Sequence, residues 1–415
     1  GPGAGAMRTE DHTFDVIIVG GGMVGLTLAA ALGQTSLRVA VVERSEPDPD
    51  AGTGDWDQRV SAITVASRRI LDNVGAWEGI AARRVSPFRE MDVRDASGPG
   101  HIHFDAADLG EPLLGHIVEN GVIRTALHDV VAELPNVRLY EPATIRRMGW
   151  DSDHMYLRLE DDRLLAGGLL VGADGGRSWV RDQAGITTRG WDYGQQAVVA
   201  TVRTAEPHRE TAWQRFLPDG PLAFLPLADG RCSIVWSTTP EHAEALTAMG
   251  DEAFRSELGE AFDHILGPVE EAGPRASFPL RLLHANAYVR PRLALVGDAA
   301  HTIHPLAGQG VNLGLADAAT LAETLLEAVA ERRGIGSIPV LRRYERRRKA
   351  DNVAMMGAMD GFKRLFGSEL APLRWMRNLG LNLTHTVLPV KNGLMRHAMG
   401  LTGELPELAR RDPER

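Results

Sequence analysis

Short, uninterrupted apolar runs mark buried strands near both ends of the chain. Residues 16–19 and 39–42 are continuous apolar stretches, which are typical of parallel strands buried on both faces, and the segment 292–296 returns to this pattern after Arg292. Residues 23–32, between the first two runs, are apolar and rich in alanine, and they predict a helix that Gly33 closes. The order strand, glycine turn, helix, strand predicts a βαβ unit and therefore an α/β fold.

Apolar side chains recur at helical spacing in three other regions. The first covers residues 59–74, and the second extends from about residue 311 to 329. The third is the tail beyond residue 342, where Pro372 and Pro389 break the pattern. The chain is therefore predicted to end in a mostly helical region.

The middle of the chain has a different pattern. Residues 198–202, 222–227 and 232–236 are strand-like segments separated by turns rich in Pro, Gly and Asp. Residues 84–104 share this character. These segments predict an antiparallel sheet that forms a second domain inserted into the first.

The composition is that of a folded globular protein. Of the 415 residues, 44% are hydrophobic and 24% are charged, which excludes disordered and fibrous classes. The net charge of −10 argues against a nucleic-acid-binding protein. No membrane span and no apolar signal core after Met7 can be found, so we expect a cytoplasmic protein. The single cysteine, Cys232, excludes an intramolecular disulfide and a cysteine-cluster metal site; we expect it to be buried, and we expect no metal site.

A glycine-rich turn joins the first predicted strand to its helix and has the spacing GxGxxG. Gly20 permits the tight turn, Gly22 lets the backbone approach a pyrophosphate, and Gly25 lets helix and strand pack closely. Glu43 ends the second strand, where an acid accepts hydrogen bonds from a ribose. Because Glu43 would repel a second anion, this pocket suits FAD or NAD rather than NADP.

Two further polar turns follow predicted strands. Asp174 and Arg177 belong to the first turn, and Gly297 and Asp298 begin the second. The second turn leads through a glycine-rich stretch into a helix, whose N-terminus can hold an anionic, planar group. From the residues alone, capping a helix or initiating a turn is the less favoured alternative role of each aspartate.

Taken together, the three motifs resemble those of the FAD-dependent aromatic hydroxylases of the para-hydroxybenzoate hydroxylase type. Residues 297–314 are similar to the signature of one branch, the UbiH/UbiI/UbiF hydroxylases of ubiquinone biosynthesis. Further segments similar to this branch are 115–120, 223–227, 233–236 and 398–401. The resemblance extends from Asp15 to about residue 408 and is strongest to UbiI, the hydroxylase of ring position 5.

The resemblance implies a Rossmann-like FAD-binding domain, an inserted antiparallel β-sheet substrate domain and a C-terminal helical region. The FAD-binding domain is expected in three parts, at residues 13–83, 107–183 and 286–345. The substrate domain is expected at residues 84–106 and 184–285, and the helical region at 346–415.

The resemblance also implies which residues bind FAD. The three glycines of the first motif would hold the pyrophosphate, Glu43 the adenosine ribose, and Asp298 the ribityl or pyrophosphate part. Arg59 and Arg124 match arginines near the phosphate or ribityl group, although Arg59 is equally consistent with a surface charge. Asp174 and Arg177 belong to a motif that supports FAD and is also implicated in NADPH use. The full expected set is Gly20, Gly22, Gly25, Glu43, Arg44, Arg59, Arg124, Asp174, Gly297, Asp298, Pro305, Gly308, Gln309, Gly310, Val311 and Asn312.

The implied reaction is an NAD(P)H-consuming ring hydroxylation. One atom of O₂ would pass to a polyprenyl phenol through a flavin hydroperoxide, at ring position 5; the alternatives are position 1 or 6, or a small soluble aromatic substrate. No second GxGxxG motif appears, so NADPH or NADH would bind transiently, and NADPH is the habit of the family. The resemblance implies that the loop 305–312 carries the flavin ring. His301 and His304 adjoin this loop and are weak candidates for proton transfer, but hydrogen bonding to the loop backbone explains them better. No catalytic residue is assigned.

Residues 341–400 carry twelve Lys and Arg against four Asp and Glu, interleaved with apolar side chains. Such a segment could rest on an anionic inner membrane as a peripheral contact, or dock another protein of a ubiquinone-biosynthesis complex. Equally, its apolar residues could pack on the FAD-binding domain while the arginines face water. The sequence carries no signal of an oligomeric state.

Overall fold

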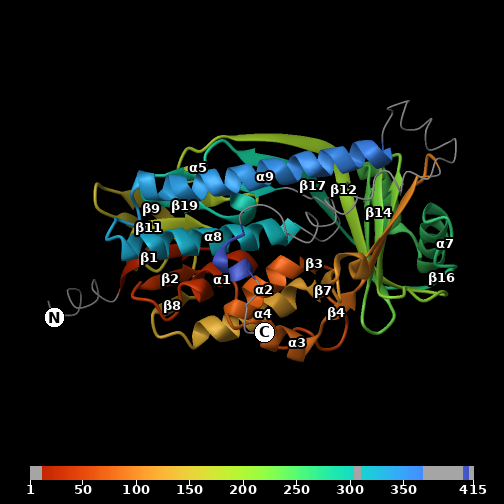
Figure 1. Ribbon diagram of the computed structural model, residues 1–415, viewed down its shortest axis with the longest axis horizontal. Helices are drawn as coiled ribbons and strands as arrows, with labels where there is room; N and C mark the ends of the chain where they lie inside the picture. Colours follow the sequence, from red (N-terminus) through yellow and green to blue (C-terminus); the bar gives the residue numbers. More distant parts are fainter. Residues whose placement is uncertain (1–11, 99, 303–309, 368–404, 411–415) are drawn as a thin grey trace.

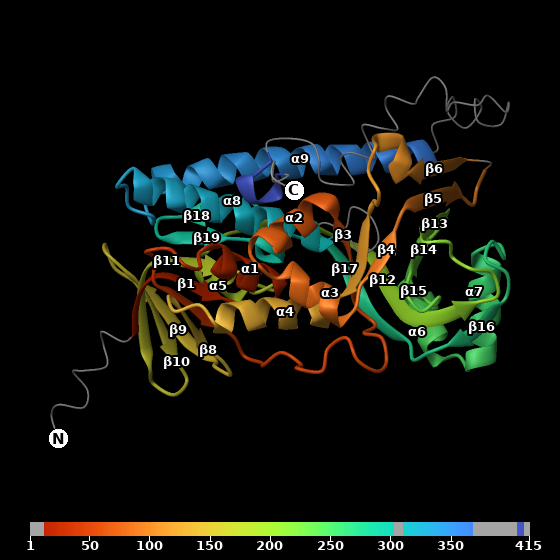
Figure 2. The ribbon, with the colours of Figure 1, turned by 60° about the horizontal axis from the view of Figure 1, so that its bottom comes forward.

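The computed structural model describes residues 12–98, 100–302, 310–367 and 405–410. Two large sheets lie at opposite ends of the molecule, and the long helix α9 runs along both of them (Figures 1 and 2). The predicted α/β class, with an inserted antiparallel sheet and a C-terminal helix, is confirmed.

The first sheet has eight strands and a parallel centre. Its central strands lie in the order β19 (Leu293–Leu295), β11 (Leu164–Gly172), β1 (Thr13–Val19), β2 (Val39–Val42) and β8 (Val137–Tyr140). Antiparallel strands complete it: β18 (Val289–Arg290), β9 (Ile145–Trp150) and β10 (Met155–Leu159). All four residues of β2 are buried, as its apolar run predicts. The helices of this half are α1 (Met23–Ala31), α4 (Asn120–Ala132), α5 (Trp179–Gln183) and α8 (Gly310–Ala330).

The second sheet has nine strands and is almost entirely antiparallel. It runs in the order β20 (His301–Thr302), β17 (Ala276–Ala285), β12 (Thr188–Thr204), β15 (Cys232–Thr238), β14 (Gly220–Pro226), β13 (Thr211–Leu217), β5 (Glu90–Asp95) and β6 (His101–Asp105), with β16 (Val269–Ala272) beside β12. Helices α6 (Pro240–Ala248) and α7 (Asp251–Ala261) pack on one face. Cys232 is fully buried in that core, and burial raises the pKa of its thiol to about 12, which keeps it unreactive.

A small third sheet corrects two details of the sequence prediction. Residues 60–64 form the strand β3 (Val60–Thr64) rather than the start of a helix, and the helix α2 (Val65–Asn73) begins only after it. β3 pairs with β7 (Gly115–Glu119), which also holds β4 (Ser86–Phe88), so β4 does not join the inserted sheet. Every residue of β3 is buried, and this environment favours its β-branched side chains as a strand. The remaining helices are α3 (Trp77–Arg83) and the short 3₁₀ turns η3 (Ala106–Leu109), η4 (Gly297–Ala299) and η5 (Glu407–Ala409).

Helix α9 (Ile338–Gly367) connects the two halves of the molecule. It is continuous across the domain boundary predicted between residues 345 and 346. Near its start, the buried Tyr344 hydroxyl donates a hydrogen bond to the Leu295 carbonyl oxygen at 2.6 Å. Farther along, Met355 packs against the core beneath β5 of the second sheet. Among the described residues, no helix is long and apolar enough to cross a bilayer.

A buried ion pair fastens α9 to α8. Asp317 of α8 is completely buried, and its Oδ1 lies 2.6 Å from Nε of Arg348 on α9. Its Oδ2 accepts a hydrogen bond from the Gly297 amide at 2.9 Å and lies 2.5 Å from Nε2 of His301. Burial disfavours the charged carboxylate, but His301 and Arg348 outweigh this and hold the pKa of Asp317 below its ordinary value.

We predict that Asp317→Ala destabilises the protein strongly, because His301 would lose its buried carboxylate partner and Arg348 would keep only the half-buried Asp351 as a counter-charge. Removing one partner of a buried pair costs about 3–5 kcal/mol, so the urea midpoint should fall clearly. The control is Glu331→Ala, which breaks exposed pairs with Arg333 and Arg343 and should cost below about 1 kcal/mol. Equal midpoints for the two variants would contradict the central role of Asp317.

Candidate active site

A cavity of about 360 Å³ lies where the first and second sheets meet. Its lining comes from both halves of the molecule and includes all three glycine motifs that the sequence singled out. From the first half come Gly22, Met23, Val24, Gln58, Arg59, Val60, Ser61, Asn120, Ala173, Gly175, Val296, Gly297, Asp298, Gly310, Val311 and Gly314. From the second sheet come Gln195, Ala197, Val199, Gln214, Phe216, Pro221, Ala223, Val235, Ser237, Phe278, Leu280 and Leu282.

The first glycine motif forms the tight turn between β1 and α1. Gly20 has φ of +111°, and a Cβ there would lie 2.2 Å from the Ala173 carbonyl oxygen. A Cβ on Gly25 would lie 1.9 Å from the Gly20 carbonyl oxygen, so the helix can approach its strand only without a side chain. At Gly22, by contrast, a Cβ would meet nothing within 4 Å, because this residue faces the cavity. Gly20 and Gly25 thus build the turn, and Gly22 leaves room for a ligand.

Glu43 and Arg124 brace the turn from the side. Oε1 of Glu43 accepts a hydrogen bond from the Gly21 amide at 3.2 Å, and Oε2 accepts one from the Ser45 amide at 2.7 Å. Nε of Arg124 donates to the Gly21 carbonyl oxygen at 3.0 Å, and its Nη2 donates to the Ser45 carbonyl oxygen. The Arg124 guanidinium also lies 3.7 Å from Glu43. These two side chains hold the end of β2 against the glycine turn, whereas Arg44 is exposed on the surface.

The third motif brings the start of α8 to the cavity. Gly297 has φ of +65°, and its amide is held by Asp317, which leaves the exposed Asp298 at the cavity wall. Gly310 and Val311 open α8 on the same wall, so the positive end of the helix dipole faces the cavity.

Two predicted residues have side chains that serve the scaffold. Asn312 accepts a hydrogen bond from the Thr64 amide at 3.2 Å and donates to the Ala62 carbonyl oxygen at 2.8 Å, which ties α8 to β3. Asp174 accepts from the Ser178 hydroxyl and from the Val180 amide at the start of α5. Burial raises the pKa of Asp174, although these hydrogen bonds favour its charged form. The residues beside them, Gly175 and Val311, line the cavity instead.

The structure gives His301 no place in the cavity wall. It is 1% exposed, and its Nε2 pairs with the buried carboxylate of Asp317. Its position therefore does not support a role in proton transfer to a substrate. His304, Pro305, Gly308 and Gln309 lie outside the described residues.

Alternate residues of five strands supply the second wall of the cavity, and most of them are apolar. Gln195, Gln214 and Ser237 are the polar exceptions among these sheet residues. Arg59 and Asp298 are the charged side chains of the described lining, and the Arg59 guanidinium carbon lies 4.4 Å from the Phe278 ring centroid. The sheet wall thus offers a dry surface with a few hydrogen-bonding groups.

Sequence reasoning did not find these polar sheet residues, nor Asp317 and Arg348. Strand alternation predicts which residues share a face, but it does not say which face meets the cavity. Asp317 could have drawn attention as an acid within a long apolar helix pattern.

Comparisons with known proteins address the function of this cavity. Residues 13–357 match the family model described as an FAD binding domain. The chain is 41% identical to a 3-demethoxyubiquinol 3-hydroxylase of Escherichia coli, over 93% of this chain and 98% of the relative. It is also 41% identical to the ubiquinone hydroxylase UbiL of Rhodospirillum rubrum, over 98% of this chain and 94% of the relative. The chain belongs to the ubiquinone hydroxylase family of flavoproteins. 

This flavoprotein is an FAD-dependent monooxygenase, as its family resemblance predicted. A solved structure, p-nitrophenol 4-monooxygenase PnpA of Pseudomonas putida, shares its fold with a TM-score of 0.75, at 21% identity over 95% of this chain and 100% of the other.

The cavity of the flavoprotein fits FAD at the residues that the sequence singled out. Gly22 and Gly175 leave space that a side chain would fill, and the N-terminus of α8 offers a positive dipole to an anionic group. Asp298 and Arg59 lie in the cavity wall, where they would contact a bound cofactor. Arg124 and Glu43 hold the loop that would carry the pyrophosphate.

We predict opposite outcomes for two substitutions in the glycine turn of the flavoprotein. Gly22→Val places its side chain in open space, so the protein should fold but retain less than a tenth of its FAD, because the pyrophosphate would be blocked. Gly25→Val collides with the Gly20 backbone and should prevent folding. The visible absorbance of bound flavin gives the FAD content, and circular dichroism gives the fold. A yellow Gly22→Val protein would refute the assignment of this turn.

Proposed function

We propose that this flavoprotein monooxygenase hydroxylates the aromatic ring of a polyprenyl phenol in ubiquinone biosynthesis, with NAD(P)H as reductant. The observation that carries the proposal is one cavity whose lining combines residues of the glycine turn and of the two polar turns with an apolar sheet wall. The names of the relatives, which are hydroxylases of ubiquinone biosynthesis, support the same substrate class.

Each wall of the cavity has a separate task in this proposal. FAD, when bound, supplies the activation of O₂ and the transfer of one oxygen atom. The sheet wall excludes water from the ring and accommodates its apolar substituents through side chains such as Phe216, Leu280 and Leu282. Gln214 or Ser237 donates or accepts a hydrogen bond at the phenol oxygen and thereby orients the ring. No ionisable side chain of the described sheet wall is needed for this task.

The proposal also includes the ring position that is hydroxylated. The resemblance favours position 5, and positions 1 and 6 are the alternatives. Two relatives with different names share the same 41% identity with this chain, so their similarity does not choose between positions.

A second candidate function rests on Arg59. A guanidinium in the cavity lining is the group that would hold the carboxylate of a small aromatic acid. The apolar sheet wall favours the polyprenyl phenol, because a small acid would leave most of that wall without a contact.

The decisive test is complementation of bacterial strains that lack the hydroxylase of ring position 5, 1 or 6. We expect the position-5 strain to regain ubiquinone, measured by mass spectrometry, and the Gly22→Val variant to restore none. Recovery of another strain alone would keep the substrate class and change the ring position. Failure of all strains, together with NADPH oxidation stimulated by a small aromatic acid but by no prenylated phenol, would favour the second candidate.

A separate proposal concerns where the protein is located, and it rests on the basic segment at residues 341–400. Arg343, Arg347 and Arg348 form ion pairs within the protein, so part of the basic run holds α9 in place. Arg342 and Arg346 are exposed on α9 and are available to an anionic surface. We propose that this segment contacts an anionic membrane peripherally, or another protein of the pathway.

We expect the protein to float with vesicles that contain an anionic lipid, because exposed arginines are attracted to a negative surface. The double variant Arg342→Glu, Arg346→Glu should reduce the bound fraction at least about twofold, since each basic residue near the surface contributes about 1 kcal/mol. Arg147→Glu combined with Arg332→Glu makes the same charge change at other exposed positions and should have less effect. Equal losses for both pairs would point to net charge rather than to this segment.

A further inference from the structure

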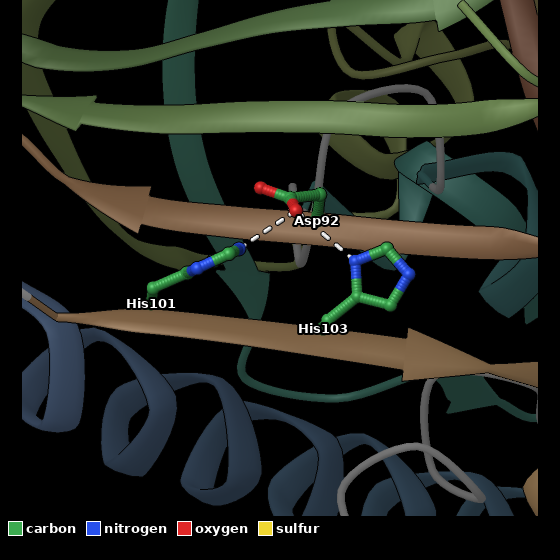
Figure 3. A group of neighbouring side chains, drawn as sticks. All are labelled: Asp92, His101 and His103. Carbon is green, nitrogen blue, oxygen red and sulfur yellow. Dashed lines mark hydrogen bonds and ion pairs between the residues drawn. The ribbon is translucent and has the colours of Figure 1, made fainter.

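An Asp–His–His cluster lies on the hairpin of β5 and β6, at the edge of the second sheet. Asp92 of β5 is directly opposite His103 of β6, and Arg94 is opposite His101. Figure 3 shows both imidazoles directed at the Asp92 carboxylate from the neighbouring strand. Nε2 of His101 lies 2.7 Å from Oδ2 of Asp92, and Nδ1 of His103 lies 3.0 Å from the same oxygen.

This cluster is separate from the flavin cavity. In the parallel pairing of β13 with β5, Asp92 is level with Trp213, whereas the cavity residue Gln214 is level with Val93. Because neighbouring residues of a strand point to opposite faces, the cluster lies on the face away from the cavity. A role for it is therefore independent of the hydroxylation.

The hydrogen bonds around His103 favour a cation. Its Nδ1 faces Asp92, and its Nε2 lies 3.2 Å from Oε1 of Glu90, so both ring nitrogens face carboxylate oxygens. A neutral imidazole has one donor and one acceptor nitrogen. In a protonated imidazole both N–H groups donate to these carboxylates. In a neutral imidazole whose Nε2–H donates to Glu90, the lone pair of Nδ1 points at Asp92, and a metal ion bound between them removes the repulsion. A carboxylate behind a histidine is also the usual outer support of a metal ligand.

Asp92 is held in the same way. Its Oδ1 accepts a hydrogen bond from Nε of Arg94 at 2.9 Å, which leaves Oδ2 directed between the two imidazoles. The residue is 3% exposed, whereas the side chains of His101 and His103 are 45% and 41% exposed. A rigid buried carboxylate with two accessible imidazoles allows an ion to enter from solvent without rearrangement of the core.

We propose that Asp92, His101 and His103 bind a divalent transition-metal ion of the Zn²⁺ type. Tetrahedral Zn²⁺ ligands are about 3.3 Å apart. The distances from Asp92 Oδ2 to the two imidazole nitrogens, 2.7 and 3.0 Å, would lengthen slightly, and the two nitrogens, which lie within 4.8 Å of each other, would adjust by side-chain movement alone. Two nitrogens and one oxygen suit Zn²⁺, Co²⁺ or Ni²⁺ better than Mg²⁺ or Ca²⁺, which prefer oxygen ligands. Water completes the coordination. The ion cross-links β5 to β6 at the exposed edge of the sheet, and this finding would replace the expectation of no metal site.

Titration of the FAD-loaded, tag-free full chain with ZnCl₂ in a calorimeter tests the proposal. We expect one site with a dissociation constant below about 10 μM, a range that three protein ligands commonly reach. His101→Gln and His103→Gln should each weaken binding at least about tenfold, and Glu90→Gln should weaken it by about 10-fold as well through the outer hydrogen bond. With Co²⁺, the visible absorption of a nitrogen- and oxygen-bound ion should appear and be lost in both histidine variants.

His242→Gln is the matched control. His242 also pairs with one carboxylate, Glu257, at 2.9 Å, but it has no second imidazole beside it in that pair. Zinc affinity should be unchanged in this variant, and all variants should keep their FAD and their circular dichroism spectrum. Absence of binding up to millimolar Zn²⁺, or equal affinity in the wild type and in His103→Gln, would overturn the proposal and leave protonated imidazoles as the partners of Asp92.

Discussion

The buried carboxylate of Asp317 is the interaction on which the arrangement of this molecule depends. One oxygen holds the amide of Gly297 at the turn of the third cofactor motif, and the other holds Arg348 of α9. His301 completes the set, so a single side chain joins the cofactor loop, two helices and the edge of the second sheet. A charge in the core is tolerable only with such partners, and one of these partners is the backbone amide of Gly297, whose turn faces the cavity.

Most of the fold could be predicted because its signals are local. The βαβ unit at residues 13–42 was found from two apolar runs and a glycine turn, and each of these needs only its neighbours in sequence. The segment at residues 60–64 was predicted wrongly as a helix. Its spacing of apolar residues fits either structure, and the strand forms only because β7, more than fifty residues later, pairs with it. Short apolar runs are ambiguous for this reason.

The candidate site was predictable where glycine is required and unpredictable where partners are distant. Gly20, Gly22 and Gly25 have distinct steric roles that follow from their spacing. The ion pair between Asp317 and Arg348 joins two helices. The spacing of apolar residues along each helix does not say which polar side chains of the two helices will face each other. The Asp–His–His cluster had a weak signal, since His101 and His103 alternate on one strand, but the opposing Asp92 emerges only from the register of the hairpin.

The continuity of α9 has a consequence for how the cavity works. A helix of 30 residues is about 45 Å long, and this one is fastened near Arg348 to the first half and packs through Met355 on the second. It therefore acts as a spacer that sets the distance between the two walls. A ligand cannot enter by hinging the walls apart unless the helix bends or the Asp317 pair breaks. The two walls therefore keep their separation as long as α9 stays straight and the Asp317 pair is intact.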